Sequence, residues 1–204
     1  MLDVPDPEPL PETGLSVGID VGLYHLLAFS NGVAVENPRW LRKSLKRLRV
    51  AQRHLSRCKK GSNRRRKAAR RVAAIHEKIA NQRLDFWHKT TRSLVNTYDT
   101  IVIEDLNLSF MTCNGHLALS AHDAALGTFR QLLTYKAEEA SRQFFAVNPS
   151  GTSQVCSACG VVVRKNLSVR VHRCDCGLII DRDVNAARNI LNLARTGPSG
   201  RGLL

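Results

Sequence analysis

The stretch that decides the fold is Val17-Gly18-Ile19-Asp20-Val21-Gly22, which reads as a buried strand ending in an acid between two glycines. This strand is predicted to run from Leu15 to Asp20. A second strand, predicted from Thr100 to Glu104, also ends in an acid. In open α/β sheets, ligands gather at the carboxyl ends of the strands. The two acids are therefore predicted to lie at the same edge of one sheet.

Strands and helices alternate along the rest of the chain. Asn31-Gly32 is the favoured turn of a β-hairpin, so the chain is expected to open with an antiparallel meander. The further expected elements are strands at residues 26–29, 33–35 and 144–147 and helices at residues 122–143 and 181–193. The first of these helices is expected to face the core with Phe129, Leu132, Leu133 and Ala137. This order of elements predicts a ribonuclease-H-like α/β fold.

Positive charge is concentrated in one part of the sequence. The chain has 204 residues and a net charge of +14, and residues 39–71 hold 16 Lys or Arg and no Asp or Glu. The rest of the chain has 15 basic and 17 acidic residues. A helix face kept for solubility would mix the two signs, whereas a dense run of one sign favours contact with phosphates. The segment is therefore predicted to bind nucleic acid.

The basic segment is expected to form a helical hairpin over residues 39–97, with a break at residues 59–63. Apolar residues recur at helical spacing in both arms, namely Leu41, Leu45, Leu48 and Leu55, then Val72, Ile75, Ile79 and Phe86. The predicted nucleic-acid-binding residues are Arg42, Lys43, Lys46, Arg47, Arg49, Arg53, Lys59, Lys60, Arg64, Arg65, Arg66, Lys67, Arg70 and Arg71. Trp40 and Trp87 flank the hairpin and either stack on a base or pack at a helix end.

Three acids are candidates for a catalytic metal centre, namely Asp20, Glu104 and Asp183. Carboxylates brought close together repel one another unless a cation is present, and Mg²⁺ or Mn²⁺ takes oxygen ligands. Two divalent ions about 3.5–4 Å apart can activate a water and stabilise the leaving oxyanion in phosphodiester cleavage. Asp105 is the alternative to Glu104, and Asp181 is predicted to cap the last helix. The predicted chemistry is metal-assisted phosphodiester hydrolysis.

Four of the six cysteines have the spacing of metal ligands. They are Cys156 and Cys159 in a CxxCG knuckle, and Cys174 and Cys176 in a tighter CxCG knuckle. Four thiolates give a closed tetrahedral zinc site, which is structural rather than catalytic. His172 stands two residues before the second knuckle, so it could replace one ligand. Free buried thiols or a disulfide are the alternative, and Cys58 and Cys113 have no partner at ligand spacing.

Taken together, these segments make the sequence similar to the C-terminal part of the TnpB family, also called OrfB, of transposon-encoded proteins related to type V CRISPR effector nucleases. The markers are residues 9–14, 17–22, 37–38, 81–83, 102–107, 151–154 and 181–191. The resemblance implies a RuvC-type domain in which Asp20, Glu104 and Asp183 bind Mg²⁺ or Mn²⁺, with a zinc-ribbon insert held by the four cysteines. It also implies an RNA-guided DNA endonuclease that uses a transposon-derived guide RNA.

The resemblance also gives an expected division of the chain. The expected parts are a linker-like N-terminus at residues 1–14, a RuvC-like domain at residues 15–150 and 178–195 with the inserted hairpin 39–97, a zinc ribbon at residues 151–177, and a flexible tail at residues 196–204. Members of the family carry a further N-terminal region that holds guide RNA. That region is expected to be missing here or supplied by a separate polypeptide. The segment at residues 127–130 departs from the family pattern.

The sequence also bears on the location of the protein and on functions other than cleavage. No run of 18 or more apolar residues is present, so no transmembrane helix is expected. Cysteines at metal spacing favour a reducing compartment, and a cytoplasmic, nucleoid-associated location in a prokaryote is expected. The alternative to an enzyme is a nucleic-acid-binding remnant or regulator that acts without cleavage. A transposon decay product without function is the third hypothesis.

Overall fold

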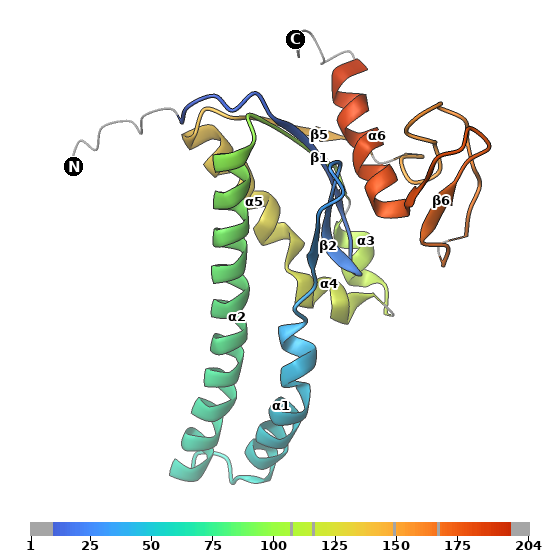
Figure 1. The fold of residues 1–204 in the computed structure, drawn as a ribbon. Helices are drawn as coiled ribbons and strands as arrows, with labels where there is room; N and C mark the ends of the chain where they lie inside the picture. Colours follow the sequence, from blue (N-terminus) through green and yellow to red (C-terminus); the bar gives the residue numbers. More distant parts are fainter. Residues whose placement is uncertain (1–9, 107, 116, 149, 167, 197–204) are drawn as a thin grey trace.

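The computed structural model describes residues 10–106, 108–115, 117–148, 150–166 and 168–196. Its centre is a five-stranded sheet in the order β3-β2-β1-β4-β5 (Figure 1). The strands are β1 (Ser16–Val21), β2 (His25–Phe29), β3 (Ala34–Glu36), β4 (Thr100–Glu104) and β5 (Gln143–Val147). β1 pairs with β4 and β4 with β5 in parallel, whereas β1–β2 and β2–β3 are antiparallel pairs. The predicted opening meander is therefore confirmed.

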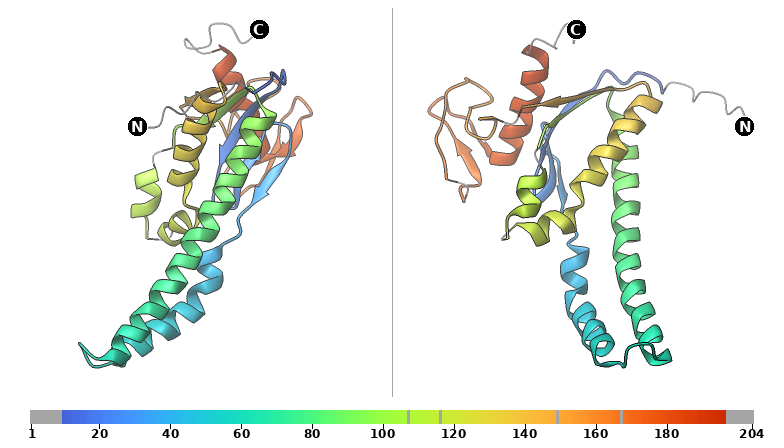
Figure 2. Two further views of the ribbon diagram at one scale, coloured as in Figure 1. Left: turned by 90° about the vertical axis from the view of Figure 1, so that its left-hand side faces the viewer. Right: turned by 180° about the vertical axis from the view of Figure 1, so that it is seen from behind.

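Helices cover both faces of this sheet (Figures 1 and 2). They are α1 (Trp40–Arg57), α2 (Asn63–Thr97), α3 (Leu108–Cys113), α4 (Ala118–Ala124), α5 (Leu126–Glu139) and α6 (Arg182–Thr196). α2 and α5 pack on one face, and α6 packs on the other. A small sheet of β6 (Val171–Arg173) and β7 (Ile179–Asp181) leads directly into α6. The chain is thus a mixed α/β fold with a cysteine-bearing appendage.

Alternation along the strands decides which side chains face which helix, because successive residues point to opposite sides of a sheet. The odd-numbered residues of β4 join the main core with α2 and α5, whereas Val102 joins a second cluster with Ile190 and Leu191 of α6. Glu104 therefore faces α6. The parallel register of β1 and β4 gives Asp20 the same side. Asp20, the last residue but one of β1, and Glu104, the last residue of β4, consequently face the helix that carries the third acid.

The single helix predicted at residues 122–143 is wrong, although its four predicted core residues are all buried. α4 and α5 are separated at Ala125, whose φ of 53° is left-handed. The bend has two anchors. The indole of Trp87 donates a hydrogen bond to the Ala124 carbonyl at 2.9 Å, and the buried Asp123 carboxylate accepts one from the Leu41 backbone N–H at 2.8 Å. These long-range contacts override the local helical pattern.

The predicted helical hairpin is present, with α1 and α2 side by side and projecting away from the sheet (Figure 2). Ser62 caps α2, since its side chain accepts a hydrogen bond from the Arg65 backbone N–H. At the base of the hairpin, Trp87 is fully buried and contacts Phe86 and Phe129. Packing rather than base stacking is therefore the role of Trp87.

Residues 10–14 lie in no helix or strand, yet they are attached to the body of the protein. The Asp99 carboxylate accepts hydrogen bonds from the backbone N–H groups of Thr13 at 2.8 Å and Gly14 at 2.6 Å. The Thr13 bond is the largest cause that lowers the pKa of Asp99. Arg142 reaches the Pro11 carbonyl at 2.9 Å. The part of the predicted linker that is described is thus fixed in place.

Three expectations concern the ends of segments. Residues 1–9 of the predicted linker and residues 197–204 of the predicted tail lie outside the described residues, and Thr196 is the last residue of α6. The small sheet extends beyond residue 177, the predicted end of the zinc ribbon, because β7 pairs with β6. Among the described helices, none is long and apolar enough to cross a membrane.

Candidate metal centres and nucleic-acid surface

α6 lies unusually close to β1 because position 18 is a glycine. A Cβ on Gly18 would lie 2.1 Å from the Ala187 carbonyl oxygen and 2.8 Å from the Leu191 Cβ. No side chain fits in that space, so only glycine permits this approach. The close packing brings the first turn of α6, which carries Asp183, next to the carboxyl ends of β1 and β4.

The structure brings Asp20, Glu104 and Asp183 together. The carboxyl groups of Asp20 and Glu104 lie close enough for each to influence the pKa of the other, and the charge of Asp183 acts on both. Glu104 is only 8% exposed. Burial, followed by the charges of Glu104 and Asp183, raises the pKa of Asp20 well above its ordinary value. Burial also raises the pKa of Glu104. A group of acids that resists ionisation in this way would be stabilised by a cation.

Asp105, the alternative at the second position, points elsewhere. Its carboxylate forms an ion pair with Arg130 at 2.6 Å, and both side chains are largely exposed. Asp105 follows the last residue of β4, and its backbone N–H donates to the Val147 carbonyl at 2.8 Å. The geometry therefore favours Glu104 as the partner of Asp20.

Asp183 is held through its backbone by Asp181 and through its side chain by Arg170. Its backbone N–H donates to the Asp181 carboxylate at 2.8 Å, as does that of Val184 at 3.3 Å, so the predicted capping role of Asp181 is confirmed. The Asp183 carboxylate lies 3.5 Å from the Arg170 guanidinium. That guanidinium also lies over the Tyr24 ring, 4.7 Å from its centroid. Arg170 thus brings positive charge from the appendage to the acid group.

The three carboxylates are spread more widely than the four thiols. In the described ranges, the cysteines form the one group of three or more potential ligands whose atoms all lie within 4.8 Å of one another. A single ion requires such convergence. Two ions about 3.5–4 Å apart require oxygen ligands that are spread over a wider space. The arrangement of Asp20 and Glu104, with Asp183 beside them, is compatible with such a two-ion site.

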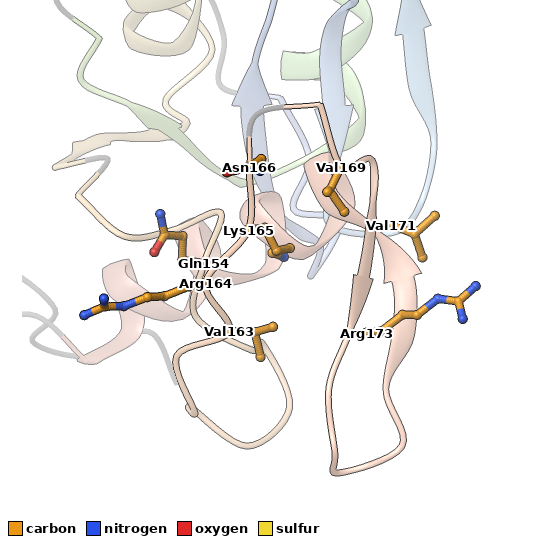
Figure 3. Close-up of a pocket in the computed structure, with 8 residues that line it drawn as sticks. All are labelled: Gln154, Val163, Arg164, Lys165, Asn166, Val169, Val171 and Arg173. Carbon is orange, nitrogen blue, oxygen red and sulfur yellow. The ribbon is translucent and has the colours of Figure 1, made fainter.

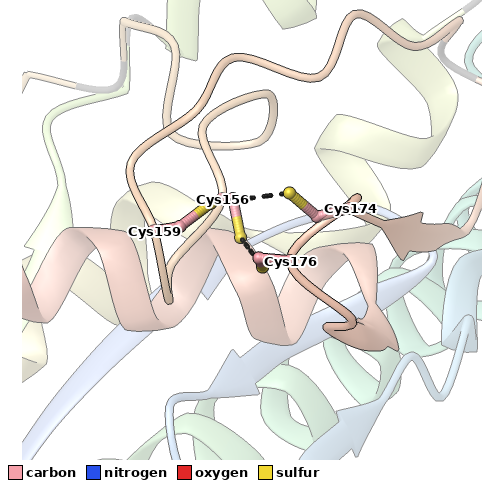
Figure 4. A group of neighbouring side chains, drawn as sticks. All are labelled: Cys156, Cys159, Cys174 and Cys176. Carbon is pink, nitrogen blue, oxygen red and sulfur yellow. Dashed lines mark hydrogen bonds between the residues drawn. The ribbon is translucent and has the colours of Figure 1, made fainter.

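The four cysteines form a compact cluster between two loops of the appendage (Figure 4). The Cys156 and Cys176 sulfurs are 3.7 Å apart, and the Cys159 and Cys174 sulfurs are 3.5 Å apart. Zinc bound tetrahedrally by four sulfurs at about 2.3 Å would set them about 3.8 Å apart. The spacing fits zinc and is too long for a disulfide, whose S–S bond is about 2.05 Å. The disulfide alternative is therefore wrong for this geometry.

The thiols of the cluster differ in their tendency to ionise. Burial raises the pKa of Cys156, but backbone N–H groups of Cys159 and Ala158 outweigh it and lower that pKa to about 6. For Cys174, the Cys176 backbone N–H lowers the pKa, but burial and the neighbouring thiols raise it to about 12. The cluster therefore gives up a first proton readily and resists losing the last. A bound cation would supply the charge that four thiolates require.

His172 lies beside the cluster but outside the group of four. Its side chain is completely buried and close to the Cys156 thiol, and Lys165 contacts its Nδ1 atom. Its Nε2 atom is buried and has no hydrogen-bond partner among the described residues. The four thiols, without the imidazole, form the group whose ligand atoms all lie within 4.8 Å of one another, so the geometry favours the four-cysteine set.

The basic residues of the hairpin form an exposed surface. Of the fourteen predicted nucleic-acid-binding residues, all but Arg65 are exposed. Arg65 instead donates to the Leu55 carbonyl at 3.2 Å and closes the end of α1. Among the residues that the structure describes, none of the fourteen forms an ion pair. Their charges therefore remain available to phosphates.

A second basic surface, which was not predicted from the sequence, lies on the appendage (Figure 3). A hollow there is lined by Gln154, Val163, Arg164, Lys165, Asn166, Val169, Val171 and Arg173. The Arg164 and Arg173 side chains extend outward on either side of Val163 (Figure 3). Arg164 and Lys165 are adjacent in the sequence, but the fold is needed to bring Arg173 of β6 to the same surface.

Two buried polar residues near the candidate sites also escape sequence reasoning. The Thr152 hydroxyl donates to the Glu104 carboxylate at 3.0 Å. Asp123 accepts from the Leu41 and Arg42 backbone and pairs with Arg83 at 3.1 Å, so it joins both arms of the hairpin to the body. Both contacts link residues more than 35 positions apart, and no local pattern encodes them.

Two family profiles match the chain. Residues 1–114 match the OrfB_IS605 family, described as "Probable transposase". Residues 127–190 match the Cas12f1-like TNB domain. The first match covers the hairpin and two of the candidate acids, and the second covers the four cysteines and the third acid.

Curated relatives and solved structures agree with these matches. A "Putative RNA-guided DNA endonuclease" of Streptomyces pristinaespiralis is 44% identical over 187 residues, and InsQ of Escherichia coli, with the same description, is 36% identical over 200. Each match covers 90% of this chain but only 46% and 50% of the relative. A Cas12f1–sgRNA–target DNA complex shares the fold with a TM-score of 0.62 at 19% identity, covering 91% of this chain and 51% of that one.

Proposed function

Because the chain belongs to the OrfB_IS605 family of transposon-associated proteins, we propose that it contains the RuvC-like nuclease centre of an RNA-guided DNA endonuclease. The observation that carries the proposal is the contact between Asp20 and Glu104, with Asp183 beside them on α6. The chain spans about half the length of the curated relatives that it matches. The activity of the whole relatives, and their guide RNA and DNA, are therefore part of the proposal.

In this proposal Asp20, Glu104 and Asp183 hold Mg²⁺ or Mn²⁺. The bound ions would activate a water and stabilise the leaving oxygen of a DNA phosphodiester. The protein's part is to hold the three carboxylates in place. Because burial disfavours the charged form of Asp20 and Glu104, the bound cations would favour their ionisation. Asp20 and Glu104 are set by the parallel register of β1 and β4, and Asp183 is set by the close approach of α6. Arg170 is suited to contact a substrate phosphate, since its guanidinium is half-exposed beside Asp183.

The cysteine cluster would hold one structural Zn²⁺. The sulfur spacing supports this assignment, and four thiolates leave no open position for a substrate. Zinc there would keep the two loops of the appendage in one arrangement. The same arrangement would then help to keep Arg170 3.5 Å from the Asp183 carboxylate.

The exposed basic surface of the hairpin would contact the phosphates of DNA or guide RNA. α1 has 18 residues and is therefore about 27 Å long, a little less than one duplex turn of about 34–36 Å. Contacts of this kind position a nucleic acid without reading its sequence. Specificity would then come from base pairing with a guide RNA.

Cleavage assays with the purified chain test the proposal. We expect Mn²⁺- or Mg²⁺-dependent cutting of labelled single- or double-stranded DNA by the wild type and none by Asp20→Asn. Asp105→Asn is the matched control, because it removes the neighbouring exposed acid and should leave cutting unchanged. Cutting that survives Asp20→Asn would show that the acid centre is wrongly assigned.

The second candidate function is nucleic-acid binding without cleavage, which the unpaired charges of the hairpin favour. Binding should fall steeply with salt as counterions are released, and Asp20→Asn should bind as the wild type does. Binding without cutting by either protein, in the presence of both metals, would favour this function over the nuclease.

A further inference from the structure

We infer that Thr152 is a positioning residue for Glu104, through which the acid centre is attached to the base of the cysteine cluster. The inference rests on the proposed function and adds a residue to it. Thr152 is 4% exposed, and its hydroxyl donates to Glu104 Oε1 at 3.0 Å. A hydroxyl that occupies one oxygen of a buried carboxylate restricts the rotation of that carboxylate.

Thr152 is itself held by a tight turn. Gly151 has a left-handed φ of 80°, and its carbonyl accepts from the backbone N–H groups of Gln154 at 2.9 Å and Val155 at 3.0 Å. The left-handed conformation favours glycine at the start of this turn. The turn fixes the direction of the Thr152 side chain, so the hydroxyl is aimed before any metal arrives.

Two asparagines of α6 fasten the same turn to the helix that carries Asp183. Asn189 is buried and donates to the Thr152 and Val155 carbonyls, each at 2.7 Å. Asn185 donates to the Val155 carbonyl at 2.7 Å and accepts from the Ser157 backbone N–H at 3.0 Å. Between these two contacts lies Cys156, the most buried of the four cysteines.

One turn therefore contacts both metal centres. It begins with the hydroxyl on Glu104 and ends at a ligand of the cysteine cluster, and α6 braces it from the side that carries Asp183. Residues that orient metal ligands commonly change metal affinity by about 10–100-fold when removed. Loss of the Thr152 hydroxyl leaves the Glu104 carboxylate free to turn away from Asp20. Part of the free energy of metal binding must then be used to fix that carboxylate, so the affinity for the ion falls.

The test measures Mn²⁺ affinity by isothermal titration in zinc-loaded protein. Thr152→Val removes the hydroxyl at nearly constant shape, and we expect Mn²⁺ to bind about 10–100-fold more weakly. Thr152→Ser keeps the hydroxyl and should restore wild-type affinity. Thr100→Val is the matched control, because Thr100 is also 4% exposed and hydrogen-bonded, but lies at the opposite end of β4 from Glu104.

The outcomes separate the inference from the proposed function. If the wild type binds Mn²⁺ and Asp20→Asn does not, the acid centre is established; wild-type affinity in Thr152→Val would then overturn the inference alone. If Asp20→Asn binds Mn²⁺ as the wild type does, the proposed centre fails. Should Thr152→Val not fold, Thr152→Ala gives the same comparison, and equal losses in Ala and Ser variants would contradict a role for the hydroxyl.

Discussion

Replacing Gly18 by alanine tests the close approach of α6 to the sheet. The added Cβ would lie 2.1 Å from the Ala187 carbonyl oxygen. Ordinary contact between carbon and oxygen is about 3.3–3.6 Å, so the helix must move outward by about 1.2–1.5 Å. The backbone on both sides resists this movement, because the strand is central in the sheet and Ala187 lies in the middle of α6.

The expected consequences follow from that displacement. Overpacking of a tight contact costs about 1–3 kcal/mol of folding free energy, which for a chain of this size lowers Tm by roughly 2–4 °C for each kcal/mol. Asp183 would move with the helix, away from Asp20 and Glu104. A misplacement of about 1 Å in a catalytic group can cost about 100-fold in rate. Metal-dependent cleavage should therefore fall far more than the loss of folded protein explains.

Denaturant unfolding and cleavage assays on the same preparations measure both effects. Gly115→Ala is the control, because its added Cβ meets no atom within 4 Å and its φ is not in the left-handed region. That substitution should leave stability and cleavage close to the wild type. Wild-type stability and cleavage in Gly18→Ala would refute the reasoning, because they would show that a Cβ fits between β1 and α6 without moving the helix.

Three further predictions concern charge and metal. Asp20→Asn should stabilise the metal-free chain at neutral pH, seen as a higher Tm in EDTA. The pKa of Asp20 is about 4 in the unfolded chain and is raised in the folded chain. The stabilisation by Asp20 is therefore complete below about pH 4 and is lost as the pH rises through the folded-state pKa. The difference in Tm between Asp20→Asn and the wild type should consequently vanish near about pH 3. Cys174→Ser should speed hydrogen exchange in β6 and β7 while β1 and β4 stay protected, because the cysteine cluster stabilises the appendage and not the central sheet. Equally faster exchange in all four strands would contradict this prediction. Lys67→Gln should weaken binding to all DNA sequences alike and reduce the salt slope by about 1, and a sequence-dependent loss would argue against a phosphate contact.

The strands and their terminal acids could be predicted because their signal is local. An apolar run that ends in an acid gives both the element and the place of the side chain, and parallel pairing of two such strands leaves the acids adjacent. The cysteine cluster has the same advantage, since spacing within each knuckle limits where the sulfurs can lie. The helical hairpin follows from apolar spacing inside a run of one charge.

The remaining features depend on contacts between distant residues. Ala125 takes a left-handed conformation where Trp87 and Leu41 hold the two residues directly before it, and nothing in the residues around it indicates a break. Thr152 and Asn189 lie in stretches that mark the family resemblance, but their roles become visible only in the fold, where they face a carboxylate and a turn. Buried polar groups must find partners, but sequence does not say which partners they find.

α6 explains why the two candidate metal centres should not be treated as independent. The helix carries Asp183, fills the space that Gly18 leaves, and holds the turn before Cys156 through Asn189. A change at the cysteine cluster that moves this turn must therefore also move the hydroxyl on Glu104 or break its hydrogen bond. Removal of zinc should consequently weaken Mn²⁺ binding in the wild type, and it should do so less in Thr152→Val, where that connection is already absent.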